Sequence, residues 1–147
     1  MKVKKEVSAG GIVFKKESGQ TLWLITQHSQ HKGWSFPKGL VAEEDKDESM
    51  ETAALREVQE EGGVKAKIVD VNPVRTTYKY ETAGYLIDKT VYYFLMKYIE
   101  GDPKDHDWEV SEAKFVPREE VMQTLSFPTD KDAFDQILKR VDPAERG

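Results

Sequence analysis

The segment Arg56–Gly63, REVQEEGG, decides how this chain is interpreted. It brings Glu57, Glu60 and Glu61 together within one short stretch, directly after Arg56. On a helix, residues three and four positions apart share a face, so these carboxylates would crowd together and repel one another. That repulsion costs only about 0.2–0.5 kcal/mol per pair on an exposed helix. The segment therefore indicates either an ordinary solvated acidic face or a site for a metal ion.

The residues around this segment predict the helix that carries it, from about Ser49 to Glu61. Apolar residues recur there with helical spacing: Met50, Ala54, Leu55 and Val58. The three glutamates lie largely off that stripe, and Gly62-Gly63 supplies the helix stop. We therefore expect one helix face in the core and the other covered by carboxylates.

Extended backward, the segment becomes GLVAEEDKDESMETAALREVQEEGGV, Gly39 to Val64, which resembles the Nudix box. From the first glutamate of the pattern onward every fixed position is matched: Glu48, Arg56, Glu57, Val58, Glu60, Glu61, Gly63 and Val64. The departure is at the front, where eight residues instead of five separate Gly39 from Glu48. We interpret the three extra residues as an insertion in a surface loop, which costs little entropy and leaves the helical half intact.

The resemblance implies a role for each matched position. In the Nudix family the glutamates that match Glu57, Glu60 and Glu61 bind a divalent metal, and the glycine that matches Gly39 contributes a backbone oxygen. The family arginine, here Arg56, is held by the glutamate that matches Glu48, an ion pair that orients the helix. Mg²⁺ is the expected cofactor, with Mn²⁺ as the alternative, because a hard cation prefers oxygen ligands. Glu57 is also a candidate general base.

Two further positions join the candidate site. The segment WSFPKG precedes the box and would put Lys38 beside the metal site as a partner for phosphate. Downstream, Glu109 lies six residues before Phe115, the spacing of the bacterial nucleoside-triphosphate branch of the family. Glu109 is therefore a candidate metal ligand or general base, and Glu112 is the alternative. Either acid is equally compatible with an ordinary solvated loop.

Beyond the box, the chain resembles the bacterial diadenosine tetraphosphate hydrolases, the asymmetrical bis(5'-nucleosyl)-tetraphosphatases. The matching pieces are SAGGIVFK, WSFPKG, ETAALREV, KTVYYFLMKYIEGDP and WEVSEAKFVP. In that branch, tyrosines near the strand after the box stack on adenine, which makes Tyr78 and Tyr80 candidates for substrate binding. Stacking is worth about 1–3 kcal/mol per base. The spacing of two puts both rings on one face of a strand, which suits a base platform and a core position equally.

The resemblance implies a Mg²⁺-dependent hydrolase in which a carboxylate activates water for in-line attack on phosphorus, giving ATP and AMP from diadenosine tetraphosphate. Other enzymes of the family are alternatives: a nucleoside triphosphate pyrophosphatase that removes oxidised nucleotides, a nucleotide-sugar hydrolase, and a diphosphoinositol polyphosphate hydrolase. The last would need a denser basic pocket. A Nudix module that binds nucleotide without hydrolysis would be favoured by loss of box residues, and none is lost here.

Composition limits the partners. The formal net charge of −5 gives no general affinity for nucleic acids or anionic membranes. The resemblance implies a small nucleotide as the partner, and we expect a monomer or a homodimer. With no cysteine, disulfides and thiolate chemistry are excluded, and His28, His31 and His106 would form at most a weak metal site. No apolar run approaches the roughly 20 residues of a membrane helix, and the N-terminus lacks a signal-peptide core, so we expect a cytoplasmic protein.

The pattern along the chain predicts one α/β domain, residues 1–147, and the resemblance implies the Nudix fold, an α/β/α sandwich with a central mixed β-sheet. We expect a hairpin of residues 6–16 and 19–27 that turns at Ser18-Gly19, with a bulge or a close backbone approach at residues 9–11. Further strands are expected at 65–81, 89–101 and 113–117, and helices at 118–127 and 129–142, the last capped by Thr129 or Asp130. The acidic insert Glu43–Asp47 is interpreted as a solvated loop, not a lid.

Overall fold

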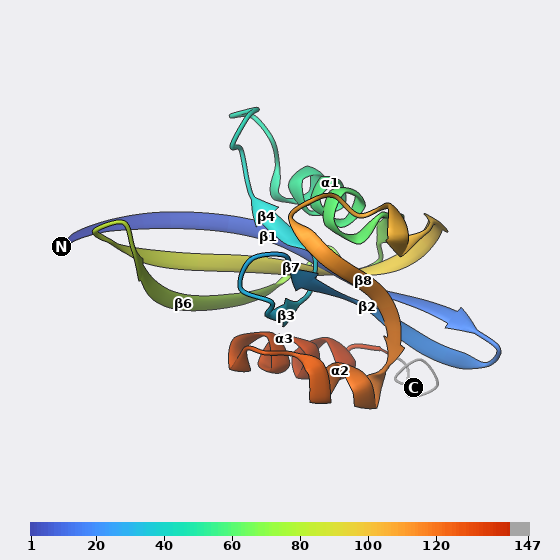
Figure 1. The fold of residues 1–147 in the computed structure, drawn as a ribbon. Helices are drawn as coiled ribbons and strands as arrows, with labels where there is room; N and C mark the ends of the chain where they lie inside the picture. Colours follow the sequence, from blue (N-terminus) through green and yellow to red (C-terminus); the bar gives the residue numbers. More distant parts are fainter. Residues whose placement is uncertain (142–147) are drawn as a thin grey trace.

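A computed structural model of the chain describes residues 1–141 (Figure 1). Its elements in chain order are β1 (Lys2–Glu17), β2 (Gln20–His28), β3 (Trp34–Ser35), β4 (Lys38–Leu40), α1 (Met50–Gly62), β5 (Val64–Ile68), β6 (Val74–Thr82), β7 (Tyr85–Gly101), the 3₁₀ turn η1 (Pro103–Asp105), β8 (Val110–Pro117), α2 (Arg118–Thr124) and α3 (Pro128–Leu138). None of the helices in residues 1–141 has the length and apolar character needed to cross a membrane.

A mixed sheet forms the centre of the molecule. β1 runs parallel to β7 from Lys2 to Phe14, whereas β2, β4, β5, β6 and β8 pair antiparallel with their neighbours. The β1–β2 hairpin turns at Ser18 and Gly19, whose φ angles of 52° and 79° are those of the two-residue turns that suit twisted strands. The expected mixed sheet and its first turn are confirmed.

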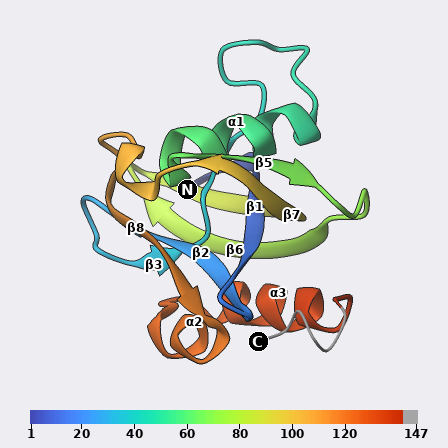
Figure 2. The same ribbon diagram turned by 90° about the vertical axis from the view of Figure 1, so that its right-hand side faces the viewer.

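Helices cover both faces of this sheet (Figures 1 and 2). α1 packs on one face over a core that includes Val13, Leu24 and Phe94. α2 and α3 lie on the other face, over a core that includes Trp23, Phe36 and Phe134. Because successive side chains of a strand point to opposite faces of the sheet, each strand contributes residues to both cores. The predicted α/β/α sandwich is therefore confirmed.

A close approach of two chain segments brings the loop before the box to the sheet. The N–H of Gly11 donates to the carbonyl of Pro37 at 3.1 Å, and a Cβ at Gly10 would overlap that carbonyl oxygen. The register of β1 on β7 runs through these residues without interruption. The close approach predicted at residues 9–11 is thus correct, and the alternative of a bulge is wrong.

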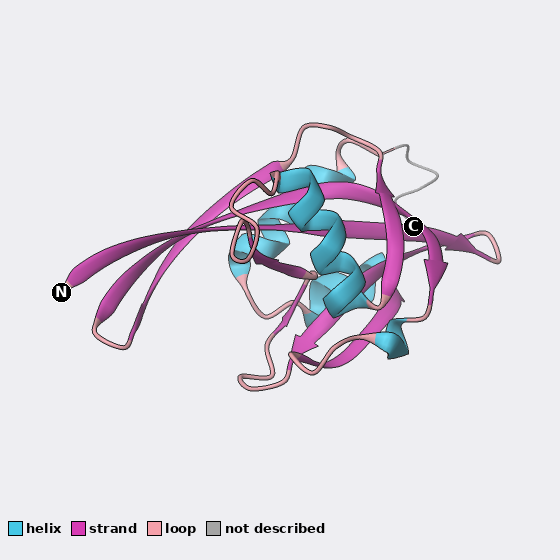
Figure 3. Ribbon diagram, turned by 90° about the horizontal axis from the view of Figure 1, so that it is seen from above, coloured by secondary structure: helices cyan, strands magenta, loops and turns pink. Residues whose placement is uncertain are grey.

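A three-stranded ribbon extends past the helices (Figure 3). It consists of the start of β1 and the two strands of the β6–β7 hairpin. β1 and β7 both begin four residues earlier than the sequence predicts. Tyr78 of β6 and Lys89 of β7 line one cavity together with residues of α1 and of the loop before it. β6 and β7 therefore contribute to the wall of this cavity as well as to the sheet.

Several local predictions need correction. Residues 65–81 form two strands, because Asn72 N–H donates to the Asp70 carboxylate and the chain turns before Pro73. The buried face of α1 also differs from the predicted apolar stripe. Ala53, which was not in that stripe, is fully buried, whereas Leu55, which was, is 36% exposed.

The C-terminal helices also differ from the prediction. α2 ends at Thr124, earlier than expected, and α3 ends at Leu138. Its N-cap is Phe127, followed by Pro128, which fits the first helical position because it has no N–H to leave unpaired. Thr129 and Asp130 lie inside the first turn and are not caps. Asp142, the predicted last residue of this helix, lies outside the described residues.

Candidate active site

Helix α1 is fixed at both ends by its own sequence. The Ser49 hydroxyl accepts a hydrogen bond from the N–H of Thr52 at 3.1 Å, and Gly63 ends the helix in the left-handed conformation with φ of 74°. Ala53, Ala54 and Val58 are buried against the sheet, so the helix cannot rotate about its axis without exposing them. The carboxylates on the other side of α1 are thereby fixed in direction.

The guanidinium of Arg56 lies at the centre of these carboxylates. Its Nε and Nη2 donate to the two oxygens of Glu48 at 2.8 and 3.1 Å. Its Nη1 donates to Glu57 at 2.6 Å and to Glu60 at 3.1 Å. Glu48 also accepts from the N–H of Ala42 at 3.1 Å. The expected Arg56–Glu48 ion pair is present, and it ties the loop before α1 to the helix.

Glu57 lies against the backbone of β4. It is only 7% exposed, and a Cβ at Gly39 would overlap its carboxylate, so no larger residue fits there without displacing it. Burial, and then the charge of Glu61, raises the pKa of Glu57 to about 8. The Arg56 guanidinium opposes that shift but does not cancel it. The positive charge of Arg56 therefore only partly balances the negative charge of an ionised Glu57.

Glu61 lies beside Glu57 and reaches the loop before α1. One of its oxygens accepts the backbone N–H of Lys38 at 3.2 Å. Burial raises the pKa of Glu61 to about 7; the charge and the backbone N–H of Lys38 oppose that shift, and the charges of Glu109 and Asp107 add to it. Asp107 is held close to the helix because its N–H donates to the carbonyl of Glu60 at 2.8 Å.

These residues fit a hard divalent cation. The donors are all oxygens, from Glu57, Glu60, Glu61 and Glu109 and from the backbone of Gly39, and three of the carboxylates, Glu57, Glu61 and Glu109, have raised pKa values that a cation would relieve. Within residues 1–141, no three acidic or histidine side chains stand ready as a metal site. Arg56 and the Lys38 N–H hold the carboxylates instead, so their rotamers must change when an ion binds.

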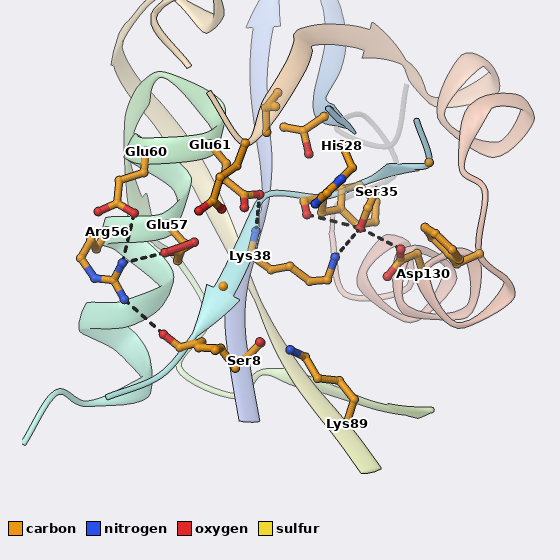
Figure 4. A pocket seen from close by; sticks show the side chains of 18 of the residues that line it. Ser8, His28, Ser35, Lys38, Arg56, Glu57, Glu60, Glu61, Lys89 and Asp130 are labelled. Atoms are coloured by element: carbon orange, nitrogen blue, oxygen red, sulfur yellow. Dashed lines mark hydrogen bonds and ion pairs between the residues drawn. The ribbon is translucent and has the colours of Figure 1, made fainter. Parts of the chain in front are cut away.

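A cavity of about 890 Å³ opens in front of the glutamates (Figure 4). Of the residues predicted from sequence, the cavity is lined by Lys38, Gly39, Glu48, Arg56, Glu57, Glu60, Glu61, Tyr78 and Glu109. Tyr80 and Glu112 are not among its lining residues. Glu112 pairs with Lys114 at 3.7 Å on β8, whereas burial and neighbouring acids raise the pKa of Glu109. The geometry therefore favours Glu109 over Glu112.

Tyr78 and Tyr80 share one face of β6, as the spacing predicts. Their ring centroids lie 6.0 Å apart with an interplanar angle of 29°. Tyr78 packs against the core between the sheet and α3 and also lines the cavity. Tyr80 is 40% exposed, and its hydroxyl lies 3.4 Å from Glu6. The two tyrosines therefore have different environments, and only Tyr78 can meet a molecule in the cavity.

The cavity is also lined by residues that the sequence analysis did not assign to this site. They are Ser35, Lys89, Asp130, the stacked imidazoles of His28 and His31, and the exposed acids Glu43, Glu44 and Asp45 of the insert. Lys89 is 8% exposed and lies 3.4 Å from Glu6. On its face of β7, Lys89 lies between the buried residues Ile87 and Val91, and this was the only sequence signal for it. Asp130 had been interpreted as a helix cap.

Residues 4–137 match the NUDIX domain. This chain belongs to the Nudix family. The Nudix box accounts for the glutamates of α1, and the family match extends from β1 to α3, which includes the elements that line the cavity.

Relatives of this Nudix chain come from several organisms. It is 32% identical over 96% of its length to a Mycobacterium tuberculosis protein that carries the name mutator protein MutT4, and 29% identical over 79% to the 8-oxo-(d)GTP phosphatase of Mycolicibacterium smegmatis. The chain spans 59% and 33% of the length of those two relatives. Among solved structures, the Caenorhabditis elegans Ap4A hydrolase superposes with a TM-score of 0.64 and 25% identity, covering 92% of this chain and 99% of that one.

Proposed function

We propose that this protein hydrolyses a phosphoric anhydride bond of a nucleoside polyphosphate in a Mg²⁺-dependent reaction. The observation that carries the proposal is the group of glutamates on α1, two with raised pKa values, at the wall of a cavity large enough for a nucleotide. A cation there would relieve their mutual repulsion and attract a phosphate chain. All box residues are present, so a purely binding role is the weaker alternative.

Each residue of the site has a role in this reaction. The carboxylates of Glu57, Glu60 and Glu61 and the carbonyl of Gly39 would hold Mg²⁺, or Mn²⁺ in its place. The bound cation would supply charge neutralisation and polarisation at the reacting phosphorus. Arg56, fixed by Glu48, keeps the helix and its carboxylates in register with the loop.

Proton transfer needs a carboxylate of raised proton affinity near the attacked phosphorus. Glu109 is the candidate that stands across from α1, and its pKa is raised by burial and by Asp107 and Glu60. It would accept the proton of the attacking water, with Glu57 as the second candidate base. Lys38 lines the cavity beside these acids and would balance the charge of the phosphates that are not attacked.

Diadenosine tetraphosphate is the first candidate substrate, cleaved to ATP and AMP. Tyr78 supports it, because its ring lies at the cavity wall and offers a surface for one adenine. The likeness to an Ap4A hydrolase over 92% of the chain points the same way. Lys38 lines the same cavity as the acids of α1 and the ring of Tyr78, which suits a phosphate chain bound with its adenine at Tyr78.

A nucleoside triphosphate carrying an oxidised base is the second candidate. Two relatives support it by their names, a mutator protein and an 8-oxo-(d)GTP phosphatase. Hydrolysis would then give a nucleoside monophosphate and pyrophosphate. The two candidates share the metal site and differ at the other end of the cavity.

A substrate panel with Mg²⁺, with products separated by chromatography, tests the proposal. ATP plus AMP from diadenosine tetraphosphate supports the first candidate, and a monophosphate plus pyrophosphate from 8-oxo-dGTP supports the second. Glu61→Gln should abolish most of either activity while the protein stays folded. Turnover that persists in EDTA, or that is unchanged in Glu61→Gln, would contradict the metal site.

A further inference from the structure

A buried carboxylate lies at the end of the cavity away from the glutamates. Asp130, in the first turn of α3, is 5% exposed and lines the cavity. It accepts hydrogen bonds from the Ser35 hydroxyl and from the Tyr93 hydroxyl, each at 2.8 Å. The N-terminus of the 11-residue helix α3 also favours negative charge at this position. None of the roles given above uses this group.

The directions of these hydrogen bonds follow from the number of protons available. A serine or tyrosine hydroxyl has one proton to donate, and an ionised carboxylate has none. Ser35 and Tyr93 each give that proton to Asp130 at 2.8 Å, since the contacts of the Ser35 oxygen with the Phe36 carbonyl and the Tyr93 hydroxyl are longer, at 3.4 Å. The oxygen of Ser35 therefore keeps only its acceptor sites for any further partner.

That further partner is the ammonium of Lys38. Its Nζ lies 3.1 Å from the Ser35 oxygen, and because an ammonium can only donate, Ser35 must accept. Among residues 1–141, Ser35 is the one hydrogen-bond partner of this ammonium, so two of its three protons are available to a ligand. Figure 4 shows the Lys38 side chain extending away from Glu61 toward Ser35 and Asp130.

We propose that Ser35 and Asp130 are positioning residues, which hold the Lys38 ammonium across the cavity from the α1 glutamates so that it receives the phosphate chain. The inference rests on the proposed function, since it assigns a task to the phosphate-binding lysine of that site. We call the three residues the Asp130–Ser35–Lys38 chain. Without this chain, the Lys38 ammonium would have other partners.

A lysine side chain at this position has an alternative set of partners. The backbone of Lys38 already donates to Glu61, and Glu57 is beside it, so a released ammonium could turn back and pair with those carboxylates. It would then compete with the divalent cation and leave the phosphate chain without its partner. The buried charge of Asp130, transmitted through the Ser35 hydroxyl, opposes that movement.

The test uses the whole protein and two readouts. In EDTA, calorimetry measures binding of a non-hydrolysable ATP analogue, and with metal present the Mg²⁺ concentration for half-maximal hydrolysis is determined. Ser35→Ala should weaken nucleotide binding about tenfold, the effect of one charge-assisted hydrogen bond, and should raise the Mg²⁺ requirement. Ser35→Thr keeps the hydroxyl and should restore both values. Asp130→Asn, a second variant with unchanged shape, should behave like Ser35→Ala.

A double-mutant cycle separates positioning from a merely structural role. In a Lys38→Met background, Ser35→Ala should have almost no further effect on nucleotide binding, because the group that it positions is gone. Ser126→Ala is the matched control: it removes a serine hydroxyl that binds the neighbouring residue of β3, the N–H of Trp34 at 2.8 Å, without contact to Lys38. Thermal melts confirm that each variant is folded.

The outcomes are distinct. Effects of Ser35→Ala and Lys38→Met that simply add, or a Ser35→Thr variant as weak as Ser35→Ala, would overturn the inference while hydrolysis by the wild type leaves the proposed function intact. A wild-type protein that neither binds nor hydrolyses any nucleotide would overturn both. Loss of the Ser35→Ala effect in the Lys38→Met background, with Ser126→Ala unchanged, supports the Asp130–Ser35–Lys38 chain.

Discussion

Arg56 and Glu48 form a two-point ion pair, with Nε 2.8 Å and Nη2 3.1 Å from the two carboxylate oxygens. The hydrogen bonds from Arg56 hold the pKa of Glu48 below its usual value. The pair joins α1 to the loop that carries the acidic insert. Its geometry also directs the remaining guanidinium nitrogen toward Glu57 and Glu60.

Glu48→Gln should therefore affect both stability and turnover. The amide retains one acceptor but loses the charge, and because Arg56 is partly exposed we expect a loss of about 1–2 kcal/mol in the free energy of unfolding. Turnover should fall at least about tenfold, since Arg56 is released to pair more closely with Glu57 and Glu60. Urea denaturation and steady-state kinetics measure the two effects. The exposed Glu51→Gln, in the first turn of the same helix, is the control and should change neither.

Among the acids outside α1, we predict that substitution of Glu109 causes the greatest loss of turnover. Glu109→Gln should lower kcat about 10²- to 10⁴-fold, the range for removal of a general base, with little change in the melting temperature. Glu112→Gln removes the same charge three residues away on β8, outside the cavity, and should keep nearly full activity. A larger loss in Glu112→Gln than in Glu109→Gln would exchange their assignments.

The pH dependence of stability follows from Glu61. Burial raises its pKa from 4.5 to about 7, so the folded metal-free protein binds this proton more tightly than the unfolded chain does. Its contribution to stability is complete below about pH 4.5 and is lost as the pH rises through 7. Glu61→Gln cannot titrate. Its melting temperature relative to the wild type should therefore increase between pH 5 and pH 8 in EDTA, and Mg²⁺ at pH 8 should stabilise the wild type more. A pH-independent difference between the two proteins would contradict the prediction.

Helix α1 could be predicted from the sequence because the interactions that define it are short in range. Ser49 caps it, Gly63 ends it, and the spacing of Arg56 and the glutamates is fixed by the helical repeat. The mixed sheet followed from strand patterns and from the family resemblance. Even so, the starts of β1 and β7 were placed too far inward, since the exposed, lysine-rich residues 2–5 have no strand pattern of their own and are ordered by pairing with residues 85–88.

The far end of the cavity could not be predicted in the same way. Ser35 and Asp130 are 95 residues apart in the chain and meet only because α3 packs under the sheet next to β3. Lys89 reaches the cavity through the parallel pairing of β7 with β1, which no pattern in its own strand reveals. Likewise, period-two spacing placed Tyr78 and Tyr80 on one face but not at different distances from the cavity.

Tyr78 and Tyr80 give a matched pair for testing base binding. Tyr78→Ala should raise KM for diadenosine tetraphosphate about fivefold or more, since stacking on one base contributes about 1–3 kcal/mol. Tyr80→Ala should change KM much less, because this ring lies outside the cavity lining. Steady-state kinetics on both variants, with thermal melts to confirm folding, makes the comparison. Equal KM values for Tyr78→Ala and the wild type would return Tyr78 to a core role.

Gly39→Ala tests the metal site without altering any charge. The backbone of Gly39 is not in the left-handed region, so alanine is compatible with it, but the added methyl would overlap the carboxylate of Glu57. Overpacking of this kind costs about 1–3 kcal/mol unless the neighbour moves, and here Glu57 has to move. Calorimetry should show weaker Mg²⁺ binding, and kcat/KM should fall at least about tenfold. In a Glu57→Asp background the shorter side chain makes room, so the same substitution should cost less stability there. Unchanged Mg²⁺ affinity and turnover in Gly39→Ala would mean that the cation does not bind between Glu57 and β4.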